Sequence, residues 1–335
     1  MSKIIILKND RTGDLFVSTP TINKILNKHQ SQKIEIFLSN INHKFSFLYP
    51  NINKRVINMD LNLIDKIYIF FYFLFNKISD VYILTPKNFY YYLPFFFRGI
   101  KFHGIVVNSE RNRPIAFLRK YLYKYVIIDR INLKKRQSSY LIQSNLVENI
   151  KNEKQLLNFN IDYKEKFNLP KRYVFFHYKK NLFQNLLKWN DREIFEIINL
   201  LSSKFENVLF SSEYKDEKIN TFFKSNFNTY DFRYNKFYSI NSKNIYFLLD
   251  IDGVDLFNTV KNADKVVSPE GIISHMAYIN KKPILAMLHF EIKNKKDIIQ
   301  QLISCKEWFP PSNYDFIVLK KDFNKSINRI LKRLI

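Results

Sequence analysis

Short apolar runs alternate with longer amphipathic stretches along most of the chain. The runs at residues 3–8, 33–38, 80–84 and 104–107 predict strands that are buried on both faces. After the first run, apolar residues recur at helical spacing and predict a helix that follows a turn near Gly13. Its apolar positions are Leu15, Phe16, Ile22, Ile25 and Leu26. Strands that alternate with helices indicate a parallel α/β sheet.

The same alternation starts again after Pro170, a residue that disfavours helix in the position before it. Amphipathic stretches predict a helix from about residue 191 and a last helix at about 322–334. The expected strands lie at 173–176, 208–210, 245–249, 265–267 and 283–287.

This restart predicts two domains, because a single core rarely grows past about 250–300 residues. The first domain is expected at residues 1–168 and the second at 169–320, with a terminal helix at 321–335. Ligands of such sheets bind beyond the carboxyl ends of the strands. Two doubly wound domains that face each other would therefore form a binding cleft.

Two aromatic segments allow more than one interpretation. Residues 67–75 fit a buried helix or a helix that touches a membrane, and residues 89–98 fit core packing or a membrane interface. The longest apolar run has nine residues, far fewer than the roughly 20 that a spanning helix needs. The pattern therefore argues against an integral membrane protein.

The net charge of +24 is unevenly distributed. Residues 1–170 hold 27 Lys and Arg against 12 Asp and Glu, a net charge of +15. Residues 111–136 hold nine basic residues and one acidic residue, Asp129. Such a field attracts anionic partners such as nucleic acid, acidic lipid or phosphorylated sugar. An AT-rich genome, which enriches Lys, Asn, Ile, Phe and Tyr together, explains the excess equally well.

Only five glycines occur, and two of them stand at strand-to-helix turns beside a carboxylate. Gly13 precedes Asp14, and Gly271 follows Glu270. Glycine lets the backbone turn sharply and lets a ligand approach closely. A helix start adds free N–H groups and a positive dipole end, which suit phosphate. Both turns are therefore candidate binding sites.

Several other kinds of site are not indicated. The acids of Asp250-Ile251-Asp252 have metal-ligand spacing but are expected as a loop pair, so no metal site and no cofactor are predicted. No Gly-x-x-x-x-Gly-Lys phosphate loop and no nucleic-acid-binding motif occurs. The single cysteine, Cys305, and an N-terminal segment unlike a signal peptide favour a reducing, cytoplasmic location.

The two glycine turns resemble the motifs of glycosyltransferase family 9, the lipopolysaccharide heptosyltransferase family. Residues 13–20 are similar to its opening pattern of Gly-Asp, small and apolar residues, then Thr-Pro. Residues 270–277 are similar to its donor-site pattern of acid, small residue, His, any residue and Ala. Further similarities occur in chain order at Lys188-Trp189, Asp252–Leu256, Pro283 and Trp308-Phe309-Pro310. The resemblance covers nearly the whole chain.

The chain departs from the family in the donor motif. The usual order there is Asp, then Ser or Thr, then Gly, whereas this chain has Glu270, Gly271 and Ile272. The carboxylate is one methylene longer and the hydroxyl is missing, which affects the choice of donor sugar more than the fold.

The resemblance implies a role for each motif residue. Asp14 would be the base that takes a proton from the acceptor hydroxyl, with Arg11, Thr12 and Gly13 forming the acceptor-side turn. From residue type alone, Asp14 is also a helix-start acid that interacts favourably with the dipole.

On the donor side, the resemblance implies that Lys188 holds the diphosphate and that the amides after Gly271 bind phosphate or sugar. Glu270 would accept hydrogen bonds from donor hydroxyls, and His275 would pack against the turn or contact the nucleotide. The acids Asp216 and Glu217 would lie near the nucleotide ribose. As ordinary surface residues, Lys188 would be solvated and Glu270 would cap a helix.

The resemblance thus implies the GT-B architecture and an inverting, metal-independent glycosyltransferase. A sugar such as heptose would pass from a nucleotide sugar, with ADP favoured, to a phosphorylated glycolipid or oligosaccharide like the lipopolysaccharide core. Residues 1–168 would bind the acceptor, residues 169–320 the donor, and the terminal helix would cross back to the first domain. The basic excess fits peripheral binding at the anionic inner face of the cytoplasmic membrane. The alternative is a catalytically silent, basic binding module for anionic glycan, lipid or nucleic acid.

Overall fold

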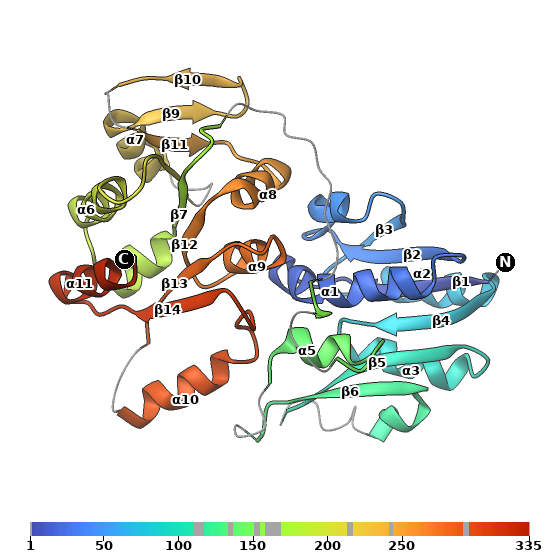
Figure 1. Ribbon diagram of the computed structural model, residues 1–335. Helices are drawn as coiled ribbons and strands as arrows, with labels where there is room; N and C mark the ends of the chain where they lie inside the picture. Colours follow the sequence, from blue (N-terminus) through green and yellow to red (C-terminus); the bar gives the residue numbers. More distant parts are fainter. Residues whose placement is uncertain are drawn as a thin grey trace. The chain divides into compact units, whose positions relative to one another are not determined.

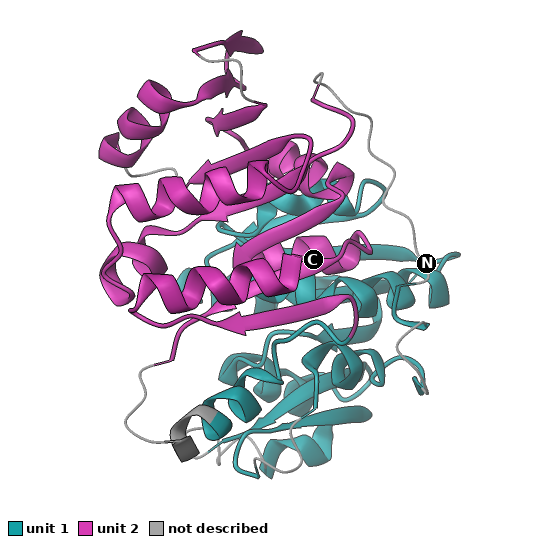
Figure 2. Cartoon of the chain, turned by 60° about the vertical axis from the view of Figure 1, so that its left-hand side comes forward, with its two compact units in different colours: residues 1–160, 294–311 teal, residues 161–293, 312–335 magenta. Residues whose placement is uncertain are grey.

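The computed structural model divides the chain into two compact units (Figure 2). Unit 1 comprises residues 1–160 and 294–311, and unit 2 comprises residues 161–293 and 312–335. The structure describes residues 2–109, 117–132, 137–150, 155–157, 169–212, 217–240, 244–290 and 295–334. The sequence-predicted boundary at 168/169 borders residues that are not described.

Unit 1 is built on a six-stranded parallel sheet with the order β3-β2-β1-β4-β5-β6 (Figure 1). The strands are β1 (Lys3–Lys8), β2 (Lys33–Ser39), β3 (Asn53–Ile57), β4 (Ile78–Ile83), β5 (Lys101–Asn108) and β6 (Lys124–Asp129). The helices are α1 (Thr12–Lys28), α2 (Leu63–Phe75), α3 (Asn88–Phe96), α5 (Ser139–Ser144) and α10 (Lys295–Cys305), with helical turns at His43–Leu48 and Arg119–Tyr121. Helices α2 and α3 cover one face of the sheet, while α1 and α5 pack against each other.

Unit 2 is built on an eight-stranded sheet with the order β10-β9-β11-β8-β7-β12-β13-β14. The strands are β7 (Val174–Tyr178), β8 (Val208–Ser212), β9 (Asn228–Asp231), β10 (Lys236–Tyr238), β11 (Ile245–Leu249), β12 (Lys265–Pro269), β13 (Ile284–Leu288) and β14 (Tyr314–Val318). The helices are α6 (Asp191–Ser202), α7 (Glu217–Asn226), α8 (Gly253–Asn262), α9 (Ile272–Ile279) and α11 (Phe323–Leu334). All neighbouring strands run parallel except β9 and β10.

The doubly wound α/β class predicted from the sequence is confirmed in both units. In β1, all four residues from Ile4 to Leu7 are fully buried, as expected for a strand with helices on both faces. In β7, Val174, Phe175 and Phe176 are likewise fully buried. The continuous apolar runs of the sequence therefore mark the central strands of the two sheets.

In each sheet the chain builds one side of its first strand and then returns to build the other side. In unit 1, β2 and β3 lie on one side of β1, and β4, β5 and β6 lie on the other. In unit 2, β8 to β11 lie on one side of β7, and β12 to β14 lie on the other. At the carboxyl edge of unit 1, the loop after β1 and the loop after β4 therefore lead to opposite sides of the sheet. The loops after β7 and β12 do the same in unit 2. Ligands bind at such switch points in open α/β sheets.

The last helix is where the structure corrects the sequence analysis. We expected the terminal helix to cross back to the first domain, but α11 packs in unit 2, where Phe323 and Ile330 are buried with α6. The segment that joins unit 1 is instead residues 294–311. It is tied there by Glu307, whose buried carboxylate accepts two hydrogen bonds from the Arg130 guanidinium, at 2.6 and 3.0 Å. An amphipathic helix packs on whichever core buries its apolar face, and the sequence does not show which of the two cores that is.

A buried carboxylate fastens α2 to the sheet of unit 1. Glu35 on β2 accepts hydrogen bonds from Tyr72 of α2 at 2.6 Å and from Arg55 of β3 at 2.8 Å, and Lys3 of β1 lies 2.9 Å away. Burial opposes ionisation of Glu35, but the hydrogen bonds from Tyr72, Arg55 and Lys3 outweigh it and lower its pKa to about 2. The carboxylate thus joins three strands and one helix.

This network gives unit 1 an acid-sensitive contribution to stability. Because the pKa of Glu35 is lower in the folded state than its usual value of 4.5, the contribution is complete above pH 4.5 and is lost as the pH falls toward 2. We expect Glu35→Gln to lower the free energy of unfolding by about 3 kcal/mol at pH 7, with the difference from wild type shrinking below pH 4.5. Urea denaturation across this pH range measures both effects. The matched control is Glu148→Gln at an exposed ion pair, which should change the free energy of unfolding far less than Glu35→Gln does.

Candidate active site

The switch point of unit 1 places Asp14 at the start of α1. The helix begins at Thr12, directly after the loop that follows β1, and Asp14 lies half-buried in its first turn. Arg11 precedes the helix in an extended conformation and is exposed, while Thr12 is buried. An acid in this position interacts favourably with the helix dipole and lies at the edge where a ligand can reach it.

A second carboxylate stands beside Asp14, and sequence analysis missed it. Asp10 lies in the loop after β1, and its Oδ2 is 2.6 Å from the Nζ of the buried Lys8. Burial raises the pKa of Asp10, the charge of Lys8 opposes this, and the negative charge of Asp14 adds to it. The two carboxylates are therefore electrostatically coupled. A lysine at the end of a buried strand, two residues before an acid, is the signal that could have revealed the pair.

The switch point of unit 2 places Glu270 and Gly271 between the end of β12 and the start of α9. Gly271 has φ of +148° and ψ of −153°, a conformation that is essentially restricted to glycine. A Cβ at this position would meet no heavy atom within 4 Å, so the space in front of it is open. Ile272 is the first residue of α9 and is half-buried. The backbone of Gly271 thus leaves the start of α9 accessible.

Two side chains surround the half-buried carboxylate of Glu270. Burial raises its pKa, and the charge of Lys179, just beyond the end of β7, opposes the increase. The Nε2 of His275 lies 4.0 Å from Glu270 Oε1. Burial lowers the pKa of His275 to about 4, so its imidazole is neutral at pH 7. His275 is therefore a neutral neighbour of Glu270 on the first turns of α9.

Lys188 is placed differently from the lysine beside Glu270. It is exposed, has φ of +63°, and lies between the helical turn Asn181–Leu186 and α6. The neighbouring Trp189 is buried and donates from Nε1 to the carbonyl of Lys321 at 3.0 Å. In the described part of unit 2, no acid pairs with Lys188. The structure thus brings the charge of Lys179 to bear on Glu270, and leaves Lys188 as an exposed cation between the helical turn Asn181–Leu186 and α6.

A cavity of about 180 Å³ opens at the carboxyl ends of β7, β8 and β11. Its lining combines polar and apolar side chains from these strands, α7 and α8: His177, Ser211, Ser212, Asn220, Phe247, Leu248, Leu249, Asp250, Ile251 and Leu256. Burial lowers the pKa of His177 to about 4, and its Nδ1 is 2.9 Å from the hydroxyl of Ser211. The volume is smaller than that of typical small-molecule sites, so it suits one part of a ligand, such as a nucleobase.

The acids expected near a ribose are only partly described. Asp216 lies outside the described residues. Glu217 is exposed in the first turn of α7, one helical turn before Asn220, which lines the cavity. The pair Asp250 and Asp252 has other tasks: Asp252 caps α8 through the amides of Val254 and Asp255, and Asp250 pairs with Arg233. The described residues contain no cluster of three potential metal ligands.

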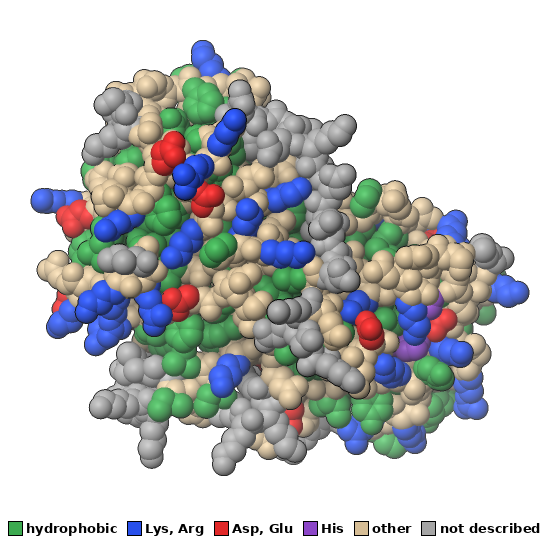
Figure 3. Space-filling view, viewed as in Figure 1, with side chains coloured by type: hydrophobic (Ala, Val, Ile, Leu, Met, Phe, Trp, Pro, Cys, Tyr) green, Lys and Arg blue, Asp and Glu red, His purple; other side chains and the backbone are tan. Residues whose placement is uncertain are grey.

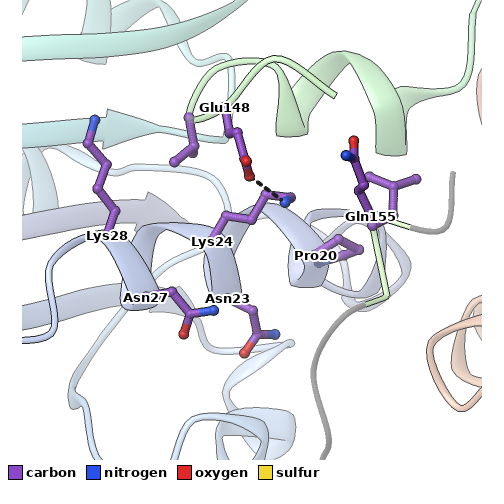
Figure 4. Close-up of a pocket in the computed structure, with 9 residues that line it drawn as sticks. Pro20, Asn23, Lys24, Asn27, Lys28, Glu148 and Gln155 are labelled. Atoms are coloured by element: carbon purple, nitrogen blue, oxygen red, sulfur yellow. Dashed lines mark hydrogen bonds and ion pairs between the residues drawn. The ribbon is translucent and has the colours of Figure 1, made fainter. Parts of the chain in front are cut away.

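A second, larger cavity of about 620 Å³ lies on unit 1, along the side of α1 (Figure 4). It is lined by Pro20, Asn23, Lys24, Asn27, Lys28, Val147, Glu148, Gln155 and Leu156. An ion pair of 2.8 Å between Lys24 and Glu148 lies across it. These residues follow the first turn of α1, so the cavity does not contain Asp14 or the other residues of the carboxyl edge.

Solved structures share this arrangement of strands and helices over the whole chain. A family 9 glycosyltransferase from Veillonella parvula has a TM-score of 0.64 and 13% identity, covering 100% of this chain and 90% of that chain. The ADP-heptose lipopolysaccharide heptosyltransferase II of E. coli has a TM-score of 0.60 and 13% identity, covering 99% of both chains. The UDP-GlcNAc 2-epimerase of Methanocaldococcus jannaschii has a TM-score of 0.54 and 14% identity, covering 98% and 92%.

The chain has the GT-B fold. By sequence, no protein-family model and no curated protein matches it. At 13–14% identity the structural likeness shows the fold alone, and that fold serves both transferases and an epimerase. The activity must therefore be argued from the residues at the two switch points.

The unusual backbone of Gly271 can be tested directly in this GT-B chain. We expect Gly271→Ala to lower the free energy of unfolding by about 1–3 kcal/mol, because alanine does not tolerate φ of +148° even though the space is open. Gly99 is the matched control, since a Cβ there also meets nothing within 4 Å and its φ lies outside the left-handed region. Gly99→Ala should leave the unfolding midpoint in urea unchanged, and equal effects of the two substitutions would contradict the assignment of strain.

Proposed function

We propose that this protein is a glycosyltransferase that takes a sugar from a nucleotide sugar and follows the chemistry of the heptosyltransferases. The observation that carries the proposal is that each unit has a glycine and a carboxylate at its switch point. Asp14 occupies this position in unit 1 and Glu270 in unit 2. A binding module without catalysis needs neither carboxylate at the edge where ligands bind.

We assign the donor to unit 2. The free amides at the start of α9 would bind the diphosphate or the sugar, as helix starts do. Lys179 and Lys188 supply positive charge on the loop after β7. The 180 Å³ cavity at the ends of β7, β8 and β11 would hold the nucleobase, and Glu217 would lie toward the ribose. An ADP-sugar is favoured because ADP-heptose is named for one of the similar structures.

We assign the acceptor and the base to unit 1. Asp14 would remove the proton of the acceptor hydroxyl, whose oxygen then attacks the anomeric carbon of the donor sugar. The bond from that carbon to the diphosphate breaks, and a single displacement inverts the configuration. Lysine side chains and backbone amides would stabilise the departing diphosphate, so the proposed mechanism is metal-independent. Lys8 and Asp10 would hold the loop that presents Asp14.

We further propose a phosphorylated glycolipid or oligosaccharide, similar to the lipopolysaccharide core, as the acceptor. The excess of 15 positive charges in residues 1–170 would attract such an anionic molecule. The reaction would take place at the inner face of the cytoplasmic membrane, in a reducing compartment, which fits a chain with a single cysteine, Cys305.

The role of Asp14 makes a kinetic prediction. Asp14→Asn keeps the shape of the side chain but removes the base, so transfer should fall about 10²- to 10⁴-fold while donor binding and the thermal midpoint stay near wild type. Sugar transfer from ADP-heptose to a lipopolysaccharide-core acceptor measures the first effect. Asp60→Asn, at an exposed acid of the same unit, is the control and should keep full activity. Undiminished turnover in Asp14→Asn would exclude it as the base.

The donor site makes a prediction about binding. Lys179→Ala and Lys188→Ala should each weaken ADP binding about 10- to 100-fold and leave adenosine binding unchanged, because only the phosphates interact with these charges. Isothermal titration with ADP and adenosine measures the difference. Lys204→Ala, near the opposite ends of the strands, is the control. An equal loss of ADP and adenosine binding would mean that the lysines support the fold and not the diphosphate.

A further inference from the structure

Helix α2 of unit 1 is apolar around its whole circumference. Its 13 residues include only two charged side chains, Asp65 and Lys66. Asp65 belongs to the capping box with Asn62 at the start of the helix. A helix that is hydrophobic all round is normally enclosed by a protein core or by a membrane.

Only half of α2 is enclosed by protein. Ile69, Tyr72 and Phe73 are buried in the core of unit 1. The opposite side exposes a stripe of large apolar residues along the full length of the helix: Leu63 at 70%, Ile64 at 75%, Ile67 at 47%, Tyr68 at 40%, Phe71 at 49%, Leu74 at 55% and Phe75 at 77%. Monomeric water-soluble proteins rarely expose so continuous an apolar patch, so this stripe marks an interaction surface.

Helix α3 and the helical turn Arg119–Tyr121 extend the stripe into one surface. Phe70 of α2 contacts Phe96 of α3 with ring centroids 5.8 Å apart, and Phe95 contacts Tyr121 at 5.8 Å. The side chains that α3 and residue 117 add to the exposed surface are Tyr92, Phe95, Phe96 and Phe117. We call these residues together with the stripe of α2 the aromatic face.

Cations surround the aromatic face. The Arg98 guanidinium lies 5.7 Å from the Phe95 ring, and the Lys120 ammonium lies 3.9 Å from the Phe117 ring. Arg119 lies 5.9 Å from the ring of Tyr125. The nearby acids are Asp65, which is used in capping, and the exposed Asp60 before α2. On the face of the chain that Figure 3 draws, Lys and Arg side chains are spread over both units with few Asp and Glu among them, in line with the net charge of +24.

We infer that the aromatic face is the surface by which this protein docks on an anionic lipid bilayer, with the apolar stripe of α2 inserted among the acyl chains. An apolar stripe with flanking Lys and Arg is the pattern of helices that lie in a membrane interface. The cations around it would meet acidic headgroups. A second copy of the chain is a poorer occupant, because a two-fold interface would bring the cations of both copies together. No helix in the described residues is long and apolar enough to span a bilayer.

The position of this surface suits the proposed function. The chain enters α2 and α3 from the carboxyl ends of β3 and β4, the same edge of the sheet that holds Asp14. The loop before α2 is tied to this edge, since Asn9 after β1 donates to the carbonyl of Asn58 at 2.9 Å. A glycolipid anchored in the bilayer would then offer its headgroup near Asp14. Only this last step rests on the proposed transfer reaction.

Vesicle sedimentation with the full chain tests the docking surface. We expect strong binding to vesicles of two parts phosphatidylcholine and one part phosphatidylglycerol, weaker binding to phosphatidylcholine alone, and binding that persists in part at high salt. Phe71→Ser/Phe75→Ser removes two exposed rings that stack 5.9 Å apart and should lower partitioning about 10- to 100-fold. Arg98→Glu/Lys120→Glu should instead abolish the preference for the anionic vesicles and the dependence on salt.

The matched control is Tyr234→Ser/Ile240→Ser, which removes two equally exposed apolar side chains from unit 2 and should bind like wild type. Unchanged binding of the Phe71/Phe75 variant, or no binding of the wild type to either vesicle, would overturn the inference. It would also be overturned if sedimentation showed a dimer that the Phe71/Phe75 variant loses, since the face would then join two copies. Asp14→Asn should bind vesicles like wild type, so a failure of the transfer assay and a failure of docking are distinguishable.

Discussion

The strand order of the two parallel sheets is the constraint on which the rest of the structure depends. Crossovers between parallel strands are right-handed, so a sheet that reverses its direction of growth about its first strand places helices on both faces. That reversal falls between β1 and β4 in unit 1 and between β7 and β12 in unit 2. At each reversal, two neighbouring loops lead away from each other at the carboxyl edge of the sheet. This leaves the starts of α1 and α9 accessible. Both glycine turns of the sequence lie at these two points.

The two switch points use a similar electrostatic arrangement. In each unit a lysine at or just beyond the end of the first strand faces an acid: Lys8 faces Asp10 in unit 1, and Lys179 acts on Glu270 in unit 2. Burial of the acids raises their pKa, and the lysines limit the increase. A partly buried carboxylate whose pKa is raised by burial and opposed by a nearby cation is a candidate functional group on physical grounds. This is the physical basis for assigning chemistry to both edges.

Helix α2 shows how one element serves both the core and the surface. Tyr72 on its inner side is held by the carboxylate of Glu35, which also binds cations from β1 and β3. This anchoring fixes the rotation of the helix about its axis. The apolar stripe that faces outward is therefore held by the network on the inner side. The sequence left residues 67–75 between a buried helix and a membrane-touching one, and the structure shows a buried side and an exposed apolar side on one helix.

Much of the fold was predictable because central strands of a parallel sheet are buried on both faces and appear as continuous apolar runs. The strands that the sequence analysis did not predict are β3, β6, β9, β10 and β14. Four of these lie at the edges of the two sheets, where one side of the strand faces solvent and polar residues interrupt the run. The fifth, β9, is buried, but three of its four residues are polar: Asn228, Thr229 and Asp231. These five strands are recognised only in the structure, by their hydrogen bonds to a neighbouring strand.

The sequence by itself located the starts of α1 and α9. Gly13 and Asp14 lie in the first turn of α1, with Gly13 in the helix rather than in the turn before it, whereas Gly271 lies in the turn between β12 and α9 with positive φ. It did not determine which side chains meet there. Lys179 reaches Glu270 because β7 and β12 are hydrogen-bonded neighbours in register, although 90 positions separate the two residues in the chain. The placement of α11 in unit 2, and of residues 294–311 in unit 1, was decided in the same way, by the core that accepts each apolar face. Local propensity follows from neighbouring residues, whereas the partners of a buried charge or an amphipathic helix depend on contacts that form only when distant segments pack.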